Sequence, residues 1–358
     1  MNKRLMKEKT GLMLKDTGLK KVAIFRALQL GDLLCCIPAV RAFKAAYPQA
    51  QITLVGLPWA ESFVKRFAHY FSGFLCFPGY PGLPEQPFDR GLYIDYLQKS
   101  TKENFDLLLQ MHGSGVITNP AASMLSARRM GGYYQEGQFK PDEALFMPYP
   151  DDKSEVERHL SLMKFLGVPL QGDHLEFPIL EEEEQAFSEL CSRYELEPQR
   201  YVCVHPGARD VKRRWSTASF ARVADMMAAK GYKVVLTGSK EEHELAEEMA
   251  AAMQHPAVNL AGRTGLGTLG ALLKHTRLLF SNDTGVSHVA AAVGAPSVVL
   301  FLTSDPARWA PQNRELHKVI LRQQIEDTGY VISVVEHTLQ EEQAVAHTLK
   351  PEELSQGI

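Results

Sequence analysis

The segment 281–296, with the sequence SNDTGVSHVAAAVGAP, contains residues that could bind a phosphate group. The apolar stretch TRLLF before it predicts a strand, and the alanine-rich residues after Asp283-Thr284-Gly285 predict a helix. The first N–H groups of a helix lack partners within the helix, and the helix dipole is positive at that end. A strand that turns through Asp-Thr-Gly into a helix therefore predicts a phosphate site. Alternatively, Asp283 or Thr284 only caps the helix.

His288 adds a second polar group to this segment. It follows Asp283 by five residues and lies one helical turn beyond Thr284 and Gly285. Residues three and four apart share one face of a helix, so this spacing can bring the imidazole back toward the bound phosphate. Asp283 and His288 could then form hydrogen bonds to a phosphate or a sugar. A histidine that belongs to the core, or that caps the helix, is the alternative.

Asp32 is a candidate for acid–base chemistry in the first half of the chain. It follows an apolar strand pattern, KVAIFRA, and lies at the start of a helical pattern, LGDLLCCIPAVRAFKAAYP. A carboxylate in this place lies at the edge of a sheet, where it could face a bound substrate. Aspartate is also a favoured N-cap residue, so a structural role is the alternative.

These segments belong to two halves of similar organisation. In both halves apolar strand patterns alternate with helical patterns, which indicates parallel βαβ units. Doubly wound sheets bind ligands at the carboxyl ends of their strands, and polar or glycine-rich residues follow several of the predicted strands. These residues are Gly31-Asp32, His112-Gly113-Ser114-Gly115, His205-Pro206-Gly207, Gly238-Ser239 and Asn282-Asp283-Thr284-Gly285. The sequence predicts an α/β protein of the GT-B type, with two doubly wound Rossmann-like domains that face each other across a cleft.

The length of 358 residues also favours two domains, because a single core rarely grows so large. We expect a basic N-terminal tail (1–19), an N-terminal domain (20–180), an interdomain linker or helix (181–200), a C-terminal domain (201–335) and a C-terminal helical tail (336–358). The linker is predicted from the acidic helical pattern EEEEQAFSELCSRYELEPQR, which ends at a proline.

Composition and charge exclude several classes of protein. The formal net charge of −3 provides no basic field for nucleic acid. Five cysteines without a CxxC pair favour free thiols in a reducing compartment. The sequence contains no apolar run of membrane-spanning length and no signal-peptide pattern at its start. The basic N-terminal segment is interpreted as a frayed tail or as a weak attachment to an anionic membrane surface.

Several separate segments resemble glycosyltransferase family 9, whose best-known members are the ADP-heptose:lipopolysaccharide heptosyltransferases. They are FRALQLGDLLCCIPAVRAFKAAYP, VHPGARDVKRRW, LTGSKEEHELAEE and NLAGRTGLGTLGALLKHTRLLFSNDTGVSHVAAAVGAPSVVLFLTSDP, in this order. The resemblance covers about residues 20–60 and 200–310, and it is loose between about 65 and 180. It implies that the N-terminal domain binds the acceptor and that the C-terminal domain binds the nucleotide-sugar donor.

The resemblance also implies roles for single residues. Asp32 would be the general base that removes the proton of the acceptor hydroxyl in an inverting transfer. Glu242 would contact the nucleoside, His288 would contact the donor, and Thr264 would lie in a loop near the adenine. A glutamate on the surface of a helix is the alternative for Glu242.

The leaving diphosphate needs positive groups around it. Family members use a lysine two residues before a tryptophan, but here Arg213 stands two residues before Trp215 and Lys212 stands three before it. Either cation could therefore bind the diphosphate, together with the N–H groups of Thr284 and Gly285, and a solvated basic loop is the alternative. The chain contains no Asp-x-Asp sequence, which disfavours a metal-dependent site, so we expect neither a metal nor a cofactor.

An anionic acceptor would need cationic or amide side chains in the N-terminal domain. The candidates are Arg26, Asn119, Arg128 and Arg129, because arginine suits carboxylates and phosphates. Surface arginines without such a role are common, and the resemblance is loose in most of this region.

Together these observations predict an inverting, metal-independent glycosyltransferase. It would move a heptose or a related sugar from an ADP-sugar to an acceptor like the lipopolysaccharide core. We expect it in the cytoplasm, and we expect peripheral attachment to the cytoplasmic face of the inner membrane. A sugar-nucleotide epimerase of GT-B type and a non-catalytic nucleotide-sugar-binding protein are the alternatives.

Overall fold

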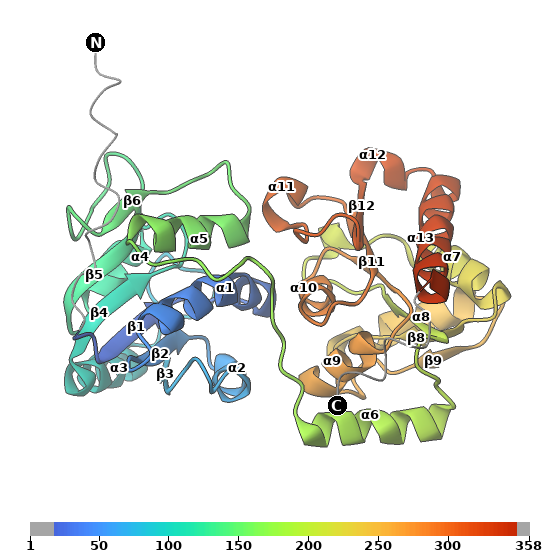
Figure 1. The fold of residues 1–358 in the computed structure, drawn as a ribbon, viewed down its shortest axis with the longest axis horizontal. Coiled ribbons are helices and arrows are strands. Elements are labelled where there is room, and N and C mark those ends of the chain that lie inside the picture. The colour runs from blue at the N-terminus through green and yellow to red at the C-terminus, as the bar shows by residue number, and fades with distance from the viewer. Residues whose placement is uncertain (1–17, 349–358) are drawn as a thin grey trace, which may run out of the picture. The chain divides into compact units, whose positions relative to one another are not determined.

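The computed structural model describes the backbone of residues 18–348 and the side chains of residues 18–341. Most of the predicted N-terminal tail and the end of the predicted C-terminal tail therefore lie outside the described residues. The chain divides into two compact units, Met1–Pro178 and Ile179–Ile358. Each unit has one parallel six-stranded sheet with helices packed on it (Figure 1), which confirms the predicted class of two doubly wound α/β domains.

The sheet of the first unit has the strand order β3-β2-β1-β4-β5-β6. Strands β1, β2 and β4 consist mainly of Val, Ile, Leu and Phe and are largely buried, as expected for parallel strands covered on both faces. The elements are β1 (Lys21–Phe25), α1 (Leu30–Ala46), β2 (Gln51–Gly56), α2 (Ala60–Arg66), β3 (Gly73–Cys76), α3 (Arg90–Glu103), β4 (Phe105–Gln110), α4 (Thr118–Ser123), β5 (Ala127–Tyr134), β6 (Phe146–Pro148) and α5 (Glu155–Phe165).

The sheet of the second unit has the order β12-β11-β10-β7-β8-β9. Its central strands β7, β10 and β11 are wholly buried. The elements are α6 (Glu181–Tyr194), β7 (Tyr201–His205), η1 (Val211–Arg213), α7 (Thr217–Ala229), β8 (Lys233–Leu236), η2 (Lys240–Glu242), α8 (His243–Ala252), β9 (Ala257–Asn259), α9 (Leu266–Lys274), β10 (Leu279–Asn282), α10 (Gly285–Ala292), β11 (Ser297–Phe301), α11 (Pro306–Trp309), β12 (His317–Leu321), α12 (Arg322–Ile325) and α13 (Thr328–Thr348).

Both sheets reverse their strand order at one place. In the first unit β2 and then β3 are added on one side of β1, and the chain then returns to add β4 on the other side. In the second unit β8 and β9 are added on one side of β7, and β10 is added on the other. Ligands of doubly wound sheets bind at such a switch point, outside the carboxyl ends of the strands. Asp32 comes shortly after β1, and Asp283 comes directly after β10. The fold therefore places each of these candidates at the switch point of its own sheet.

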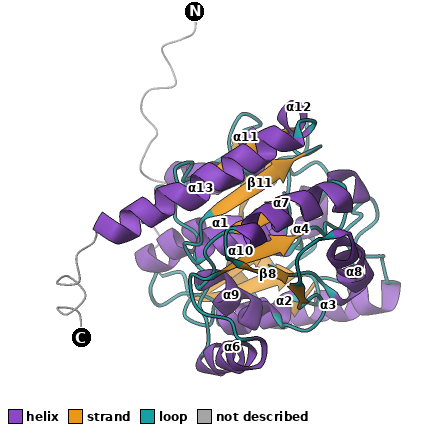
Figure 2. Cartoon of the chain, turned by 90° about the vertical axis from the view of Figure 1, so that its right-hand side faces the viewer, coloured by secondary structure: helices purple, strands orange, loops and turns teal. Residues whose placement is uncertain are grey.

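Residues 181–200, which we expected to link the domains, belong to the second unit. Helix α6 packs on α9, where Phe187 stacks on His275 with 4.9 Å between ring centroids. Helix α13 begins before the predicted C-terminal tail at 336 and packs on α7, β11 and β12 (Figure 2). Val331, Val335 and Leu339, spaced four residues apart, are buried in the core of this unit. The early part of the predicted tail is thus part of a domain core.

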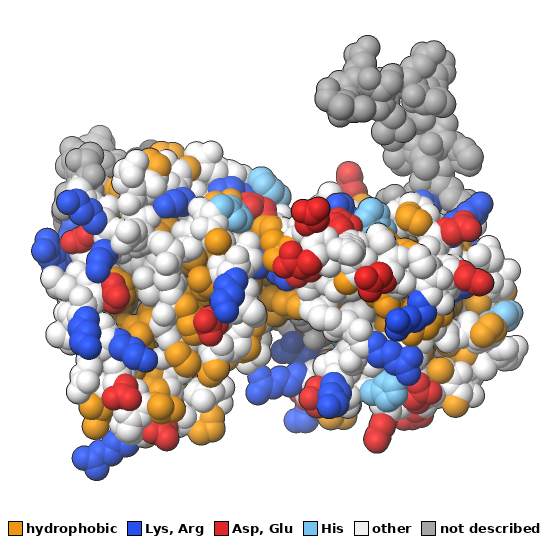
Figure 3. All heavy atoms as spheres, turned by 90° about the horizontal axis from the view of Figure 1, so that it is seen from below, with side chains coloured by type: hydrophobic (Ala, Val, Ile, Leu, Met, Phe, Trp, Pro, Cys, Tyr) orange, Lys and Arg blue, Asp and Glu red, His pale blue; other side chains and the backbone are white. Residues whose placement is uncertain are grey.

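The surface is mixed in charge. Acidic and basic side chains are interspersed on the face shown in Figure 3, in agreement with the small net charge. Among the described residues, we find no helix with both the length and the apolar composition needed to cross a bilayer.

Candidate functional site

Asp32 is the third residue of α1. The backbone N–H of Gln29 donates to Asp32 Oδ2 over 3.3 Å, so the aspartate completes a capping box at the start of the helix. Its side chain remains 20% exposed. A carboxylate in this place can cap the helix and also accept a proton from a bound hydroxyl, so the two interpretations of Asp32 are compatible.

Arg26 directly follows β1 and is completely buried. It donates from Nε to the backbone carbonyl of Asp32 over 2.8 Å and from Nη1 to the carbonyl of Met111. Its Nη2 lies 3.0 Å from Glu155 Oε1 and 3.6 Å from Asp32 Oδ1. The side chain has no exposed surface and its donors face groups of the protein, so the structure gives Arg26 a structural position.

Asn119 is also completely buried, at the start of α4. Its amide nitrogen donates to the carbonyls of Tyr133 (2.9 Å) and Phe139 (3.1 Å). These bonds attach α4 to the end of β5 and to the loop after it. The structure therefore gives the amide nitrogen of Asn119 a structural role.

Arg128 and Arg129 lie in the amino-terminal part of β5. Arg128 Nη1 is 3.5 Å from Asp106 Oδ1, and Asp106 also accepts the backbone N–H groups that begin β1. In a parallel sheet the amino ends of the strands lie at the edge opposite the carboxyl ends. The two arginines are therefore at the far edge of the sheet from Asp32, and the structure does not bring them to its site.

A pair formed by the buried His112 and the half-buried Glu85 lies at the carboxyl edge of the first sheet. His112 Nδ1 accepts the N–H of Ala27 over 3.3 Å, and its Nε2 lies 3.4 Å from Glu85 Oε1. Burial alone would raise the pKa of Glu85, but His112 lowers it below its ordinary value. We did not assign either residue a role from the sequence. The glycine-rich segment that starts at His112 could have indicated a role for that residue, whereas Glu85 lies in a Pro/Gly-rich loop that shows no recognisable pattern.

In the second unit, Asn282 holds together the loops at the switch point. Its side chain is completely buried, donates to the carbonyl of Pro206 over 2.8 Å and accepts the N–H of Trp215 over 3.1 Å. It thus ties the His-Pro-Gly loop and the end of the basic loop to the last residue of β10. Asn282 lies in the segment 281–296 that the sequence singled out, but its role in joining the two loops depends on tertiary contacts.

Asp283 and Arg213 form an ion pair beside the Asp-Thr-Gly turn. Arg213 Nη1 lies 3.6 Å from Asp283 Oδ2, and the hydroxyl of Ser304 donates to the same oxygen. The Asp283 side chain is 3% exposed, whereas that of Arg213 is 39% exposed. Asp283 therefore holds the arginine at the turn while the guanidinium remains accessible from solvent.

Lys212 is the other candidate cation for the diphosphate. It lies in the short helix η1, is exposed, and has no ion pair recorded within the described part of the chain. Asp210 caps this helix by accepting the N–H of Lys212 over 3.0 Å. Of the two cations, Arg213 is the one that the fold attaches to the Asp-Thr-Gly turn.

Thr284 and Gly285 begin α10 as the N-cap and the first helical residue. The carbonyl of Thr284 accepts from both the N–H (3.0 Å) and the hydroxyl (2.8 Å) of Ser287. No side chain caps the helix, so its first N–H groups point outward, as at any uncapped N-terminus. Gly285 is half-buried and does not adopt a left-handed φ. Its lack of a side chain, and not its backbone freedom, is therefore the property that would let a ligand approach.

His288 lies on the first turn of α10 and is 5% exposed. Its ring makes an edge contact with Trp309, with 6.3 Å between centroids. The histidine therefore belongs largely to the packed side of the helix. Contact with a donor would involve only the small exposed part of the ring.

Glu242 lies at the carboxyl edge beside the His-Pro-Gly loop. Its Oε2 accepts the N–H of Ser239 over 2.8 Å and lies 3.8 Å from His205 Nε2. Burial lowers the pKa of His205, while Glu242 acts in the opposite direction. A Cβ atom on Gly207 would lie 2.2 Å from Glu242 Oε1, so the glycine is needed for this approach. Glu242 is thus fixed in place with 12% of its side chain exposed.

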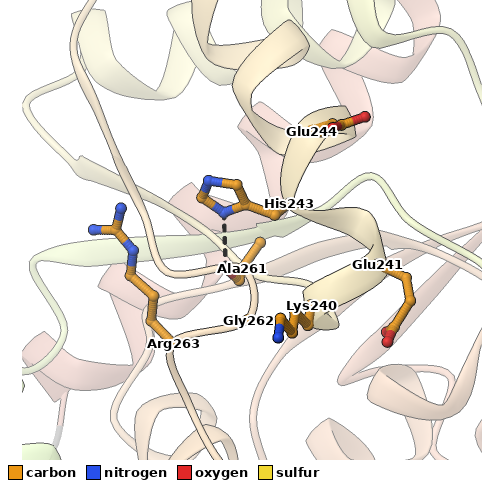
Figure 4. Close-up of a pocket in the computed structure, with 7 residues that line it drawn as sticks. All are labelled: Lys240, Glu241, His243, Glu244, Ala261, Gly262 and Arg263. Atoms are coloured by element: carbon orange, nitrogen blue, oxygen red, sulfur yellow. Dashed lines mark hydrogen bonds between the residues drawn. The ribbon is translucent and has the colours of Figure 1, made fainter.

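A pocket of about 540 Å³ lies among the residues that follow strands β8 and β9 (Figure 4). It is lined by Lys240, Glu241, His243, Glu244, Ala261, Gly262 and Arg263. His243 Nδ1 lies 3.0 Å from the carbonyl oxygen of Ala261 and connects the two sides. Thr264 directly follows the lining residue Arg263 and is half-buried. The predicted nucleoside residues Glu242 and Thr264 therefore flank one pocket along the chain.

Comparison with known proteins identifies the family. Residues 96–331 match the profile of glycosyltransferase family 9 (heptosyltransferase). The chain belongs to this family. It is 33% identical to lipopolysaccharide heptosyltransferase 2 of Escherichia coli K12 over 325 residues, which cover 84% of this chain and 88% of the relative. Membership of this family supports sugar transfer over the epimerase and binding-protein alternatives.

Solved structures share the fold of this glycosyltransferase. A family 9 glycosyl transferase from Veillonella parvula has a TM-score of 0.76 at 20% identity, covering 92% of this chain and 99% of that one. The ADP-heptose lipopolysaccharide heptosyltransferase II of E. coli has a TM-score of 0.70 at 22% identity, with coverage of 90% and 99%. At such identities the comparison establishes the GT-B fold class alone.

Proposed function

We propose that this family 9 glycosyltransferase transfers a heptose, or a closely related sugar, from an ADP-sugar to an acceptor like the lipopolysaccharide core. The observation that carries the proposal is the Asp-Thr-Gly turn at the switch point of the second unit, with Arg213 attached to it. A helix N-terminus and an accessible guanidinium together suit the diphosphate of a nucleotide sugar. The names of the relatives support the choice of heptose and of the acceptor.

Asp32 is the general base in the proposed reaction. It takes the proton of the acceptor hydroxyl as that oxygen forms a bond to the anomeric carbon of the sugar. The bond from the anomeric carbon to the diphosphate breaks, and the electron pair leaves with ADP. Attack on the side opposite the leaving group inverts the anomeric centre.

The second unit stabilises the leaving diphosphate in this proposal. The N–H groups at Thr284 and Gly285, the guanidinium of Arg213 and the ring of His288 supply hydrogen bonds to it. Glu242, Thr264 and the adjacent pocket bind the nucleoside. The reaction needs no metal, so transfer in the presence of EDTA is expected to equal transfer without it. Loss of activity on chelation that magnesium or manganese restores would contradict this part.

The proposed place of action is the cytoplasmic face of the inner membrane, because the acceptor is a lipid-linked glycan. Binding of the protein to vesicles with and without anionic lipid would test whether it attaches to that surface.

A panel of ADP-, UDP- and GDP-sugars tests the donor assignment by thermal shift. A ligand at about 100 times its dissociation constant stabilises the folded protein by about 2.7 kcal/mol. We expect the ADP-sugars to raise the melting temperature most. A larger rise with UDP- or GDP-sugars would overturn the ADP assignment, and release of an altered sugar from donor incubated alone would overturn transfer as the reaction.

A further inference from the structure

The completely buried Arg26 lies between two carboxylates of the first unit. Its Nη2 is 3.0 Å from Oε1 of Glu155, the first residue of α5, and 3.6 Å from Oδ1 of Asp32, on α1. The shorter contact is thus with Glu155, which is itself 3% exposed. Asp32 is the only one of these three charged side chains with a substantial exposed fraction, 20%.

Glu155 is in turn held by two further residues of α5. Arg158 Nη1 forms a short ion pair with Glu155 Oε2, and His159 Nε2 lies 3.5 Å from Oε1. Burial lowers the pKa of His159 to about 4, so its ring is neutral at pH 7. Arg26 and Arg158 together with Glu155 and Asp32 then carry a net charge of zero. A buried charge is tolerated when it is paired in this way, so the neutral cluster depends on an ionised Asp32.

The same charges keep Glu155 and Arg26 ionised. Burial alone would raise the pKa of Glu155, but His159 and Arg26 hold it well below its usual range. Burial would lower the pKa of the Arg26 guanidinium, but Glu155 and Asp32 raise it above its ordinary value.

We propose that Glu155 is a positioning residue for the general base and acts through Arg26; this inference rests on the proposed role of Asp32. Arg26 fixes the turn that carries Asp32 by binding its backbone carbonyl over 2.8 Å and by binding the carbonyl of Met111 after β4. Glu155 fixes Arg26 and holds its Nη2 at the longer distance from Asp32 Oδ1. The carboxylate of Asp32 is thereby oriented and charge-stabilised by an arginine whose shorter ion pair is with Glu155.

Replacement of Glu155 by Gln removes this restraint. Arg26 then has one ionised partner within reach in place of two, so it closes on Asp32 and engages the oxygen that should take the proton. We expect kcat to fall by about 10- to 100-fold, which is the loss caused by a misplacement of about 1 Å at a reacting group. The KM for the donor and the affinity for ADP should stay unchanged, because the proposed donor residues lie in the second unit.

Glu176→Gln is the matched control. Glu176 pairs with Arg41 and accepts from Tyr70 in the same unit, and it has no recorded contact with Asp32 or Arg26 among the described residues. It should alter stability without a fall in kcat. Glu155→Asp keeps the charge and should recover part of the kcat lost in Glu155→Gln. Arg26→Lys removes the guanidinium group that bonds to three partners, so it should lower kcat as well.

All variants are compared as full-length protein by steady-state kinetics, ADP calorimetry and thermal melting. An unchanged kcat in folded Glu155→Gln would overturn the positioning role. If that variant does not fold, unchanged kcat in both Glu155→Asp and Arg26→Lys would overturn it. Asp32→Asn separates this result from a failure of the proposed function. If the Asp32→Asn variant retains full transfer, Asp32 is not the base. If that variant is inactive while the Glu155 and Arg26 variants keep an unaltered kcat, the positioning role alone is refuted.

Discussion

Both units place an arginine beside an aspartate at the switch point of the sheet, but the burial of the two partners is reversed. In the first unit Arg26 is completely buried and Asp32 is 20% exposed. In the second unit Asp283 is 3% exposed and Arg213 is 39% exposed. The accessible member of the first pair is thus an anion, and the accessible member of the second pair is a cation.

This difference fits the two tasks that sugar transfer requires. An accessible carboxylate can receive a proton, and the buried arginine behind it favours the charged form and fixes its direction. An accessible guanidinium can bind a diphosphate, and the buried carboxylate beside it fixes the side chain in place. The same two residue types therefore support different chemistry, and burial decides which partner meets the substrate.

Asp32→Asn gives the sharpest test of this comparison and the largest expected effect on transfer. Asparagine keeps the shape of the side chain but cannot take the proton, so transfer should fall by about 10²- to 10⁴-fold. Titration calorimetry of ADP should give an unchanged dissociation constant, since the proposed donor residues lie in the other unit. Equal losses of transfer and of ADP affinity would break the division of tasks between the units.

Gly285→Val tests the anion-binding side of the comparison. A branched side chain on the first residue of α10 should crowd the approach of the diphosphate to the N–H groups of Thr284 and Gly285. A hydrogen bond to a charged group contributes about 1.5–3 kcal/mol, so loss of two such bonds should weaken ADP binding by about 3–6 kcal/mol. Calorimetry on the folded variant measures this change, and far-ultraviolet circular dichroism controls for the helix.

Arg213→Ala and Lys212→Ala form a matched pair in the basic loop. We expect Arg213→Ala to weaken ADP binding by about 1.5–3 kcal/mol, because it removes a charged donor next to the Asp-Thr-Gly turn. Lys212→Ala should change the affinity less, since Lys212 is exposed whereas Arg213 is paired with Asp283 of the turn. The opposite ranking in calorimetry would mean that the lysine binds the diphosphate.

His288→Ala should have the smallest effect of these variants. The ring is 5% exposed, so it can offer one hydrogen bond at most to the donor, and ADP affinity should fall by less than in Gly285→Val. The melting temperature should also fall slightly, because the ring packs near Trp309. If both Gly285→Val and His288→Ala bind ADP as tightly as the unaltered protein, the Asp-Thr-Gly turn is only a helix start.

Much of the fold was predictable because its signals are local. Apolar strand patterns of four to six residues alternate with helical patterns, and this alternation determines a parallel doubly wound sheet. The carboxyl ends of the strands could be located along the sequence, so Asp32, Asp283 and the His-Pro-Gly loop were recognised as edge residues. The sequence did not show that α6 and the first part of α13 pack within the second unit, because a helical pattern does not show which core its apolar face will join.

The acceptor candidates show where prediction from the sequence ends. Arg26, Asn119, Arg128 and Arg129 were suitable by residue type, yet the structure buries the first two and places the last two at the amino edge of the sheet. Whether a polar side chain faces a ligand or another protein group depends on which distant elements pack around it. Glu155 illustrates this, since 129 residues separate it from Arg26 in the chain, although the two side chains lie 3.0 Å apart.

The sequence by itself determined the class of fold, the family and the strand ends at which chemistry can occur, because these follow from periodicity and short motifs. Only the tertiary structure decided that Arg213 is attached to the Asp-Thr-Gly turn and that Asn282 clamps two loops. It also decided that Asp32 belongs to a neutral cluster with the buried charges of Arg26, Glu155 and Arg158. Burial and ion pairing arise from contacts between elements far apart in the chain. Periodicity and spacing along the sequence carry no information about those distances.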